Sequence, residues 1–244
     1  GALGLGARGS PRCRLQSLAL SLNPLAAEGA AALTHALKGN TSLRHLALEY
    51  ITLYSREPAN LLSTVLAAEC RLERLSLSFN YISACGSPVE QITHQLAANT
   101  TLAELRVRRC CIGGWRRARA IARGIQGNTS IAALDLSYNG LGAAQAAAST
   151  LSLAVGTLKE AFRRNATLRS VNLAHNALGA TGSLEIVRAA LRGPSITMLD
   201  LQSNAMGIEG VRAIACELAA GGHAWLPLAL NAHARGVREA AVSA

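Results

Sequence analysis

The stretch IAALDLSYNGL, residues 131–141, decides the fold predicted for this chain of 244 residues. Its recurring positions are the first, fourth, sixth, ninth and eleventh, occupied by Ile131, Leu134, Leu136, Asn139 and Leu141. Leu134 and Leu136 are separated by one residue, and this period of two is typical of a β-strand that buries one face. The stretch is therefore predicted to begin with a short strand.

The same pattern recurs along the chain at an even spacing. Eight copies begin at Leu15, Leu43, Leu72, Leu102, Ile131, Leu168, Ile196 and Trp225. Consecutive first residues are 28 to 30 residues apart, except for one step of 37 after the fifth. The ninth position is Asn in five copies, but it is Ile51 in the second, Cys110 in the fourth and His233 in the divergent eighth. Such regularity indicates a repeat protein.

The second half of each copy has the spacing of a helix. Apolar residues four positions apart precede each following strand: Leu33/Leu37, Leu62/Leu66, Ile92/Leu96, Ile121/Ile125, Leu158/Phe162, Val187/Leu191 and Ile214/Leu218. Because residues four apart lie on one helix face, each copy is predicted as a strand followed by a helix. One such unit cannot cover its apolar face, but stacked units share a continuous core.

This strand–helix repeat resembles the leucine-rich repeat family, in its ribonuclease-inhibitor-like class. The resemblance covers residues 15–244 as one domain of about eight repeats, and residues 1–14 are expected to be a remnant of a preceding repeat or a tail. It implies an α/β leucine-rich-repeat solenoid (horseshoe), with a parallel sheet on the concave side and helices on the convex side. It also implies a non-enzymatic binding role. In the family the Asn satisfies backbone groups in a turn, so Ile51 and Cys110 predict altered turns in repeats 2 and 4.

Four sites in the chain fit the N-x-[ST] pattern of a glycan acceptor: Asn40, Asn99, Asn128 and Asn165. All four stand three residues before the next strand begins, where a helix must end and the chain must turn. Asn tolerates left-handed backbone, and a nearby Ser or Thr can bond the main chain. They are interpreted as structural spacers, with glycan acceptors as the alternative.

The bulk composition argues against several classes of function. The formal net charge is +10, but the excess of Arg and Ala is discounted as a functional signal. The six cysteines form no C-x-x-C pair and have no His at ligand spacing, which favours a reduced, intracellular setting, in the simplest case cytoplasmic, and predicts no metal site. No nucleophile–base–orienter set is visible, so no enzyme and no cofactor are predicted. No apolar run is long enough to span a membrane.

Partner-binding residues are predicted from the strand alternation. Positions 3, 5 and 7 of each repeat should point outward onto the concave sheet, with position 8 at its rim. The predicted concave residues are His45, Glu49, Arg74, Glu104, Arg106, Arg108, Asp135, Asn172 and Asp200, and the rim adds Tyr50, Phe79, Arg109, Tyr138 and His175. Aromatic side chains together with Arg are typical of binding hot spots. The alternative is that position 8 packs within the turn.

Repeat 4 carries the densest positive charge of the chain. Arg106, Arg108 and Arg109 are predicted on or near the concave face, and Arg116, Arg117, Arg119 and Arg123 on the following helix. Such a cluster suits an acidic protein surface or a phosphate backbone, and its alternative is a solvated face.

Repeat 5 contains roughly eight extra residues and lacks charge over residues 142–157. An uncharged surface segment is predicted to contact a partner, here through Leu151 and Leu153. The alternative is a longer convex helix that packs on its neighbours.

Together these features predict a protein–protein interaction scaffold or a structural subunit of a larger intracellular assembly, which includes cytoskeletal or organellar assemblies. The expected partner is a protein with an acidic surface, and no membrane is expected. Two alternatives remain open. One is a structural ribonucleoprotein subunit that contacts RNA phosphates through the repeat-4 arginines, and the other is the ligand-sensing repeat region of a NOD-like receptor.

Overall fold

The computed structural model of the protein describes residues 14–38, 40–51, 64–66, 71–80, 88–113, 115–142, 148–220 and 228–229. Strands and helices alternate along these residues: β1 (Ser17–Ala19), α1 (Ala26–Leu37), β2 (His45–Ala47), β3 (Arg74–Ser76), α3 (Pro88–Ala98), β4 (Glu104–Arg106), α4 (Trp115–Gly127), β5 (Ala133–Asp135), α5 (Ala148–Arg164), β6 (Ser170–Asn172), α6 (Gly179–Arg192), β7 (Met198–Asp200), α7 (Gly207–Ala220) and β8 (Leu228–Ala229). The expected tail at residues 1–13 and His233 lie outside the described residues.

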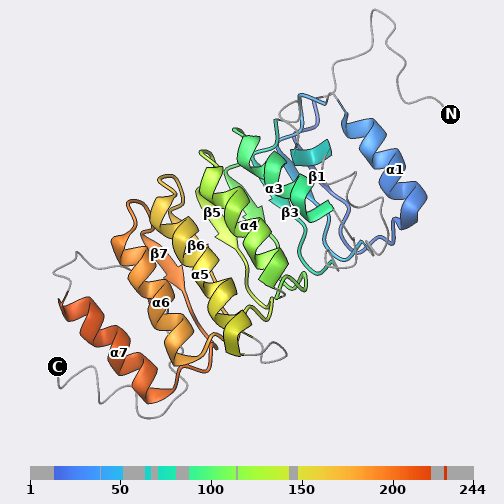
Figure 1. Ribbon diagram of the computed structural model, residues 1–244. Coiled ribbons are helices and arrows are strands. Elements are labelled where there is room, and N and C mark those ends of the chain that lie inside the picture. Colours follow the sequence, from blue (N-terminus) through green and yellow to red (C-terminus); the bar gives the residue numbers. More distant parts are fainter. Residues whose placement is uncertain are drawn as a thin grey trace, which may run out of the picture.

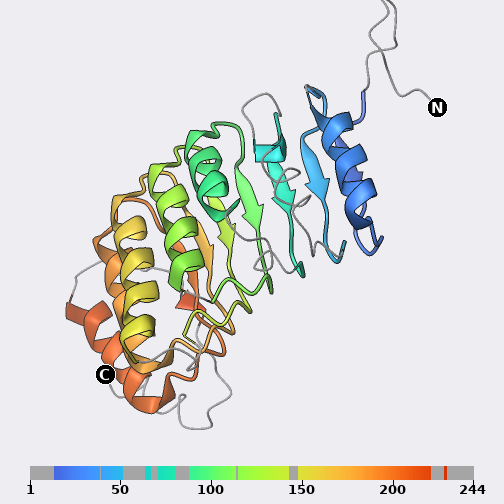
Figure 2. The same ribbon diagram turned by 45° about the vertical axis from the view of Figure 1, so that its right-hand side comes forward.

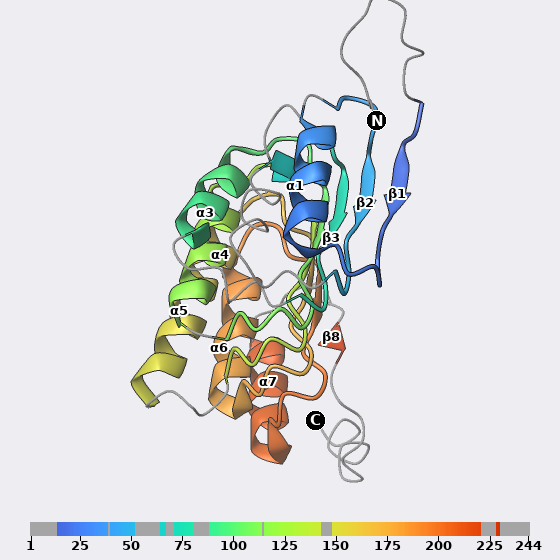
Figure 3. The same cartoon turned by 90° about the vertical axis from the view of Figure 1, so that its right-hand side faces the viewer.

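The strands form one eight-stranded parallel sheet in the order of the sequence. Equivalent repeat positions pair with one another, so that Leu105 is opposite Leu134 and Leu134 is opposite Val171. The helices stand side by side in a second layer (Figure 1), which covers one face of the sheet (Figure 2). A view along the stack separates the two layers (Figure 3). The predicted α/β leucine-rich-repeat solenoid is confirmed.

The core lies between the two layers. From the strand side come the residues at the fourth and sixth positions, such as Leu134 and Leu136, which are fully buried. From the helix side come Leu96, Ile125 and Phe162, which are the second members of the predicted apolar pairs and are also fully buried. Each repeat therefore shares its core with the repeat on either side, as the spacing predicted.

Each strand from β1 to β7 is followed by the same sharp turn. The residue at position 8 has left-handed backbone in all seven described turns: Leu22, Tyr50, Phe79, Arg109, Tyr138, His175 and Ser203, with φ between 52° and 65°. This conformation reverses the extended chain toward the helix layer. It also leaves buried backbone donors and acceptors that need partners.

The conserved geometry of these turns depends on the Asn at position 9. Asn139 Nδ2 donates to the carbonyls of Leu136 in its own repeat (2.9 Å) and Val107 in the preceding repeat (2.8 Å). Its Oδ1 accepts the backbone N–H of Cys110 (2.8 Å) and Ile112. Asn176 and Asn204 repeat the arrangement, so each buried amide bonds two successive turns.

The altered turns expected in repeats 2 and 4 are not observed. Tyr50 and Arg109 have the same left-handed backbone as the other position-8 residues. The turn of repeat 2 keeps its shape because Asn80 of the next repeat accepts the backbone N–H of Ile51 at 3.0 Å. The turn of repeat 4 keeps its shape because the thiol of Cys110 lies within bonding distance of the carbonyls of Leu77 (3.2 Å) and Arg108 (3.3 Å). A neighbouring Asn and a weak thiol donor therefore replace the missing amide.

A second row of amides runs along the opposite edge of the sheet, where helices end. Asn99, Asn128 and Asn165 directly follow α3, α4 and α5 and are at most 2% exposed. Asn128 Nδ2 donates to the carbonyls of Leu96 and Asn99 (both 2.8 Å), and its Oδ1 accepts two backbone N–H groups of its own turn. A glycan would be attached to this buried, bonded nitrogen. The interpretation as structural spacers at helix-to-strand junctions is confirmed for Asn99, Asn128 and Asn165, whereas Asn40 is half-buried and bonds its turn through Oδ1 alone among the described residues.

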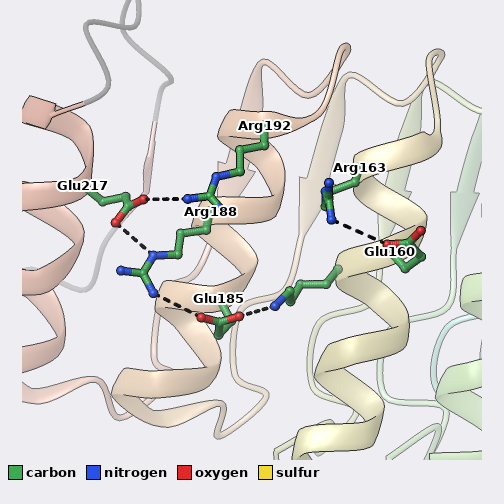
Figure 4. A network of polar contacts seen from close by, with 7 residues as sticks. Glu160, Arg163, Glu185, Arg188, Arg192 and Glu217 are labelled. Atoms are coloured by element: carbon green, nitrogen blue, oxygen red, sulfur yellow. Dashed lines mark hydrogen bonds and ion pairs between the residues drawn. The ribbon is translucent and has the colours of Figure 1, made fainter.

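An ion-pair network joins the last three described helices on the outer surface (Figure 4). Lys159 of α5 pairs with Glu185 of α6, which also pairs with Arg188 at 3.2 Å. Arg188 continues to Glu217 of α7 at 2.9 Å. The Lys159 hydrogen bond, followed by the Arg188 hydrogen bond, lowers the pKa of Glu185 against the opposing effect of burial.

No helix among the described residues is long and apolar enough to cross a membrane.

Substitution of a central core residue tests the shared core. Leu136→Ala should lower the free energy of unfolding by about 2–5 kcal/mol, because it leaves a cavity between two layers. Leu22→Ala is the control, since Leu22 is 74% exposed, and should change it by less than about 0.5 kcal/mol. Equilibrium denaturation followed by circular dichroism measures both. In a stack of repeats the loss should also separate the unfolding of the two halves. Equal effects of the two substitutions would show that Leu136 is not a core anchor.

The amide row is tested by Asn139→Ala against Asn23→Ala, which is the same substitution at the same repeat position. Asn139 is buried and joins two turns, whereas Asn23 is exposed and bonds only Leu20 and Ser21. Asn139→Ala leaves several buried backbone groups unsatisfied and should cost roughly 3 kcal/mol or more, and Asn23→Ala should cost less than about 1 kcal/mol. Equilibrium denaturation measures the free energy of unfolding of both variants. A similar loss of stability in both would rule out the proposed role of the buried amide row.

The ion-pair network should give a pH-dependent contribution to stability. Because the pKa of Glu185 is lowered in the folded state, its contribution is fully present above the ordinary value of 4.5 and is lost as pH falls through the folded value. The stability difference between the wild type and Glu185→Gln should therefore be constant near neutral pH and shrink in acid. Glu209→Gln is the control, since Glu209 is largely exposed. Thermal melts between pH 3 and pH 7 provide the test, and a difference that does not change with pH would contradict it.

Candidate functional site

The outward face of the sheet is formed by the side chains at positions 3 and 5 of each repeat, which are the first and last residues of the three-residue strands. The central position of each strand from β2 to β7 is buried, and the flanking positions are half-buried or exposed. A shallow hollow over β1 to β4 is lined by residues that include His45, Arg74, Glu104 and Arg106. The structure thus brings these four predicted binding residues together on one surface.

The predicted outward direction of position 7 is wrong in three repeats. The strands are only three residues long, and position 7 already belongs to the turn. Ser78, Ser137 and Ala174 are buried there. Ser78 Oγ accepts the backbone N–H of Arg108 at 3.3 Å, so this side chain supports the turn of the next repeat. The alternation of a strand cannot be extended past the residue at which the extended backbone ends.

Several of the predicted concave charges are already paired with one another. Glu104 forms ion pairs with Arg106 at 2.5 Å and Arg74 at 3.6 Å. Glu49 forms a hydrogen bond with the hydroxyl of Ser76 in the next strand. The repeat-4 arginine cluster is therefore partly neutralised on the concave face itself.

The acidic and amide side chains at position 5 of the last repeats are partly used in local turns. Asp135, Asn172 and Asp200 each accept the backbone N–H two residues later, at 2.8–2.9 Å. Such bonds stabilise the exit from the strand. One oxygen of each side chain is thus occupied in the free protein.

At the rim, four predicted position-8 residues and Arg108, at position 7 of repeat 4, form a continuous stack, named here the rim ladder: Tyr50, Phe79, Arg108, Tyr138 and His175. The rings of Tyr50 and Phe79 are stacked at 4.5 Å between centroids, and those of Tyr138 and His175 at 4.0 Å. Tyr50 and Tyr138 are 47% and 37% exposed. The ladder follows the carboxyl ends of β2 to β6, so five repeats contribute to it.

Arg108 bridges the only repeat within the ladder that lacks an aromatic residue at position 8. Its guanidinium carbon lies 5.4 Å from the ring centroid of Phe79 and 4.4 Å from that of Tyr138. Both contacts are cation–π interactions. Arg109, at position 8 itself, is exposed and makes no side-chain hydrogen bond or ion pair with the described residues. The sequence placed Arg108 on the concave sheet. In the structure Arg108 instead lies between the rings of the rim ladder, and Arg109 is exposed beside it.

The turn itself does not require these side chains. Leu22 and Ser203 adopt the same left-handed backbone at position 8 without taking part in the ladder. The conformation costs a non-glycine residue roughly 1–2 kcal/mol, so Gly would suit the turn better. The turn alone therefore does not explain the bulky residues at these strained positions.

The remaining candidates are less informative. Arg117 Nη1 donates to the carbonyl of Cys111 at 3.2 Å, whereas the side chain of Arg116 lies outside the described part of the chain. Burial raises the pKa of the Cys110 thiol to about 12, which makes it a poor nucleophile. The described residues contain no group of His, Cys, Asp and Glu that could hold a metal ion.

The uncharged segment of repeat 5 enters helix α5. Residues 143–147 and the side chains of Leu151 and Leu153 lie outside the described residues, so their predicted contact stays a prediction. The next turn of the helix packs inward, because Ala154 and Val155 belong to the buried core. At least this part of the segment is therefore an extension of the convex helix.

Comparison with known proteins agrees with this architecture. The family model described as Leucine Rich repeat matches residues 13–33, 164–186 and 194–215. No curated protein matches the chain. Among solved structures, the chain is similar to leiomodin-1 actin-binding site 2 with a TM-score of 0.44 and 14% sequence identity, over 68% of this chain and 87% of that chain.

The three matched segments fall in the first, sixth and seventh strand–turn–helix units. The strands between them continue the same sheet in the same register. These observations support the fold of a leucine-rich-repeat solenoid.

Proposed function

We propose that the protein is an intracellular, non-enzymatic scaffold of the ribonuclease-inhibitor-like class that binds a protein partner. Residues 15–244 would act as one domain. The contact would centre on the rim ladder and the adjacent concave face, with the uncharged start of α5 as a second contact. The observation that carries this proposal is the stack in which Tyr50, Tyr138 and His175 are exposed and Phe79 and Arg108 are half-buried.

The composition of the ladder supports protein binding. Tyr and Arg are enriched among the residues that dominate the binding energy of protein interfaces. Stacking restrains each side chain before the partner arrives, so less side-chain entropy is lost on binding. A partner therefore meets an ordered row of rings.

The dimensions of the ladder also support it. Four steps between neighbouring strands, at about 4.8 Å each, give a row of about 19 Å. An extended peptide advances about 3.3 Å per residue, so about six residues of a partner would span the row. Backbone bonds fix this spacing, since the N–H of each ladder turn donates to the next repeat, as Tyr138 does to Ala174 at 3.0 Å.

A ladder variant tests the proposal. Tyr50→Ser, Phe79→Ser and Tyr138→Ser together should reduce recovery of specific proteins from native extract, measured by quantitative mass spectrometry, at least tenfold. Each lost hot spot is worth more than about 1 kcal/mol, and 1.4 kcal/mol is tenfold. The Kd of each recovered protein, purified and measured by biolayer interferometry, should rise to the same extent.

The control variant is Leu22→Ser with Ile208→Ser. Both residues are exposed apolar side chains outside the ladder, and Leu22 has the same position and backbone conformation as the ladder residues. This variant should bind like the wild type, and circular dichroism should show that both variants are folded. A folded ladder variant that keeps wild-type affinity for every recovered protein would refute the proposal.

A further inference from the structure

We propose that Arg108 and Arg109 form a carboxylate-binding seat in the middle of the rim ladder, and that the partner occupies it with an extended acidic segment. This inference rests on the proposed scaffold function and specifies the chemistry of the partner.

The first observation is the state of the Arg108 guanidinium. It is held between the rings of Phe79 and Tyr138, yet none of its nitrogens makes a hydrogen bond to the described residues. Its Nε is shielded from solvent and lacks an acceptor. A donor that has lost water without gaining a partner costs about 1–3 kcal/mol. A carboxylate brought to this guanidinium would supply the opposite charge that the described residues do not provide.

The second observation is the contrast with neighbouring arginines. Arg44 pairs with Glu73 at 3.3 Å, and Arg74 and Arg106 share Glu104. Among the residues that the structure describes, no carboxylate pairs with Arg108 or Arg109. The acidic residue of the adjacent strand, Asp135, instead accepts the backbone N–H of Ser137. Two adjacent positive charges are thus left unpaired at the centre of a row of rings.

The backbone of the seat is fixed although its side chains lack acceptors. The N–H of Arg108 is bonded to Ser78 Oγ and that of Arg109 to the carbonyl of Ser137 at 3.0 Å. Nearby, Arg117 reaches back to the carbonyl of Cys111 in the same turn and adds a third guanidinium to the region. A partner carboxylate would therefore meet donors on a rigid base with a positive local potential.

The stacking within the ladder favours a protein over a single-stranded nucleic acid. Bases bind such surfaces by stacking on open aromatic faces. Here the facing sides of Tyr50 and Phe79 cover each other, as do those of Tyr138 and His175. Arg108 occupies the space between the two pairs. Ring edges and unpaired guanidinium donors remain for the partner, and these suit apolar side chains and carboxylates.

The arrangement also predicts a spacing in the partner. The aromatic pairs lie on either side of the seat, and Phe79 and Tyr138 are two strand steps apart, or about 10 Å. Three residues of extended chain cover this distance. The segment should therefore carry one or two acidic residues flanked on both sides by apolar residues.

The test uses fluorescein-labelled nine-residue peptides and fluorescence anisotropy with the whole chain. One peptide has two central Glu residues flanked by Leu, the second has Gln in place of both Glu, and a ten-nucleotide uridine RNA is the third probe. The Glu peptide should bind at least tenfold more tightly than the Gln peptide at 150 mM NaCl. Arg108→Gln with Arg109→Gln should abolish that difference, and Arg109→Gln alone, at an exposed side chain, should reduce it.

The matched control is Arg119→Gln with Arg123→Gln on α4. It removes the same charge from two arginines that also make no side-chain bond or ion pair with the described residues. The control should retain the preference for Glu. An equal loss in both double variants would overturn the seat and indicate a general charge effect. Equal binding, or no binding, of the two peptides would also overturn it, as would tighter binding of the RNA that depends on Arg108 and Arg109.

The proteins recovered with the wild-type scaffold separate this inference from the proposed function. If the ladder variant loses them while a folded Arg108→Gln, Arg109→Gln variant retains them, the scaffold stands and the carboxylate seat fails. If both variants lose them and the control keeps them, both are supported. If both variants retain them, both fail.

Discussion

The structure depends on satisfying the buried backbone of one sharp turn in every repeat. The left-handed residue at position 8 ends the strand, and in the central repeats the backbone groups beside it are bonded by a buried Asn and lie away from water. A side-chain amide meets this need because it has donors and an acceptor on one short group. As the bonds of Asn139 show, its donors reach its own turn and the turn before, while its acceptor serves only the preceding turn. Satisfying one repeat therefore also ties it to the next.

The same constraint creates the edge of the sheet along which the rim ladder lies. Since every turn has the same backbone, position 8 recurs at the spacing of the strands and always lies at the rim. Side chains placed there are brought within stacking distance of their neighbours without any further device. At the other edge of the sheet, Asn99, Asn128 and Asn165 form the second amide row. Each donates a hydrogen bond to a carbonyl of the preceding repeat. The residues of the proposed binding surface occupy the few repeat positions that the core and the turns do not require.

Much of this architecture could be predicted from the spacing of residues alone. Strand register, the buried helix pairs and the junction sites follow from repeat geometry, in which equivalent positions have equivalent environments. Pairings between side chains of neighbouring repeats could not be predicted. The sharing of Glu104 by two arginines and the intercalation of Arg108 depend on rotamers and on which neighbour is closer. The compensation at Cys110 likewise required an acceptor at a distance that no sequence pattern specifies. A signal for Arg108 existed, namely adjacent arginines in a repeat flanked by aromatic position-8 residues.

The place of Arg108 has a consequence for how the repeats relate to one another. They share a backbone plan, yet they are not interchangeable modules. In the fourth repeat the position-7 side chain, Arg108, lies between the rings of the neighbouring repeats, where position 8 supplies no aromatic residue. The neighbouring repeats have the small, buried residues Ser78 and Ser137 at position 7. Exchanging the order of the central repeats would preserve the core pattern while breaking the row of rings. The row of rings therefore depends on the order of the repeats as well as on the residues within each repeat.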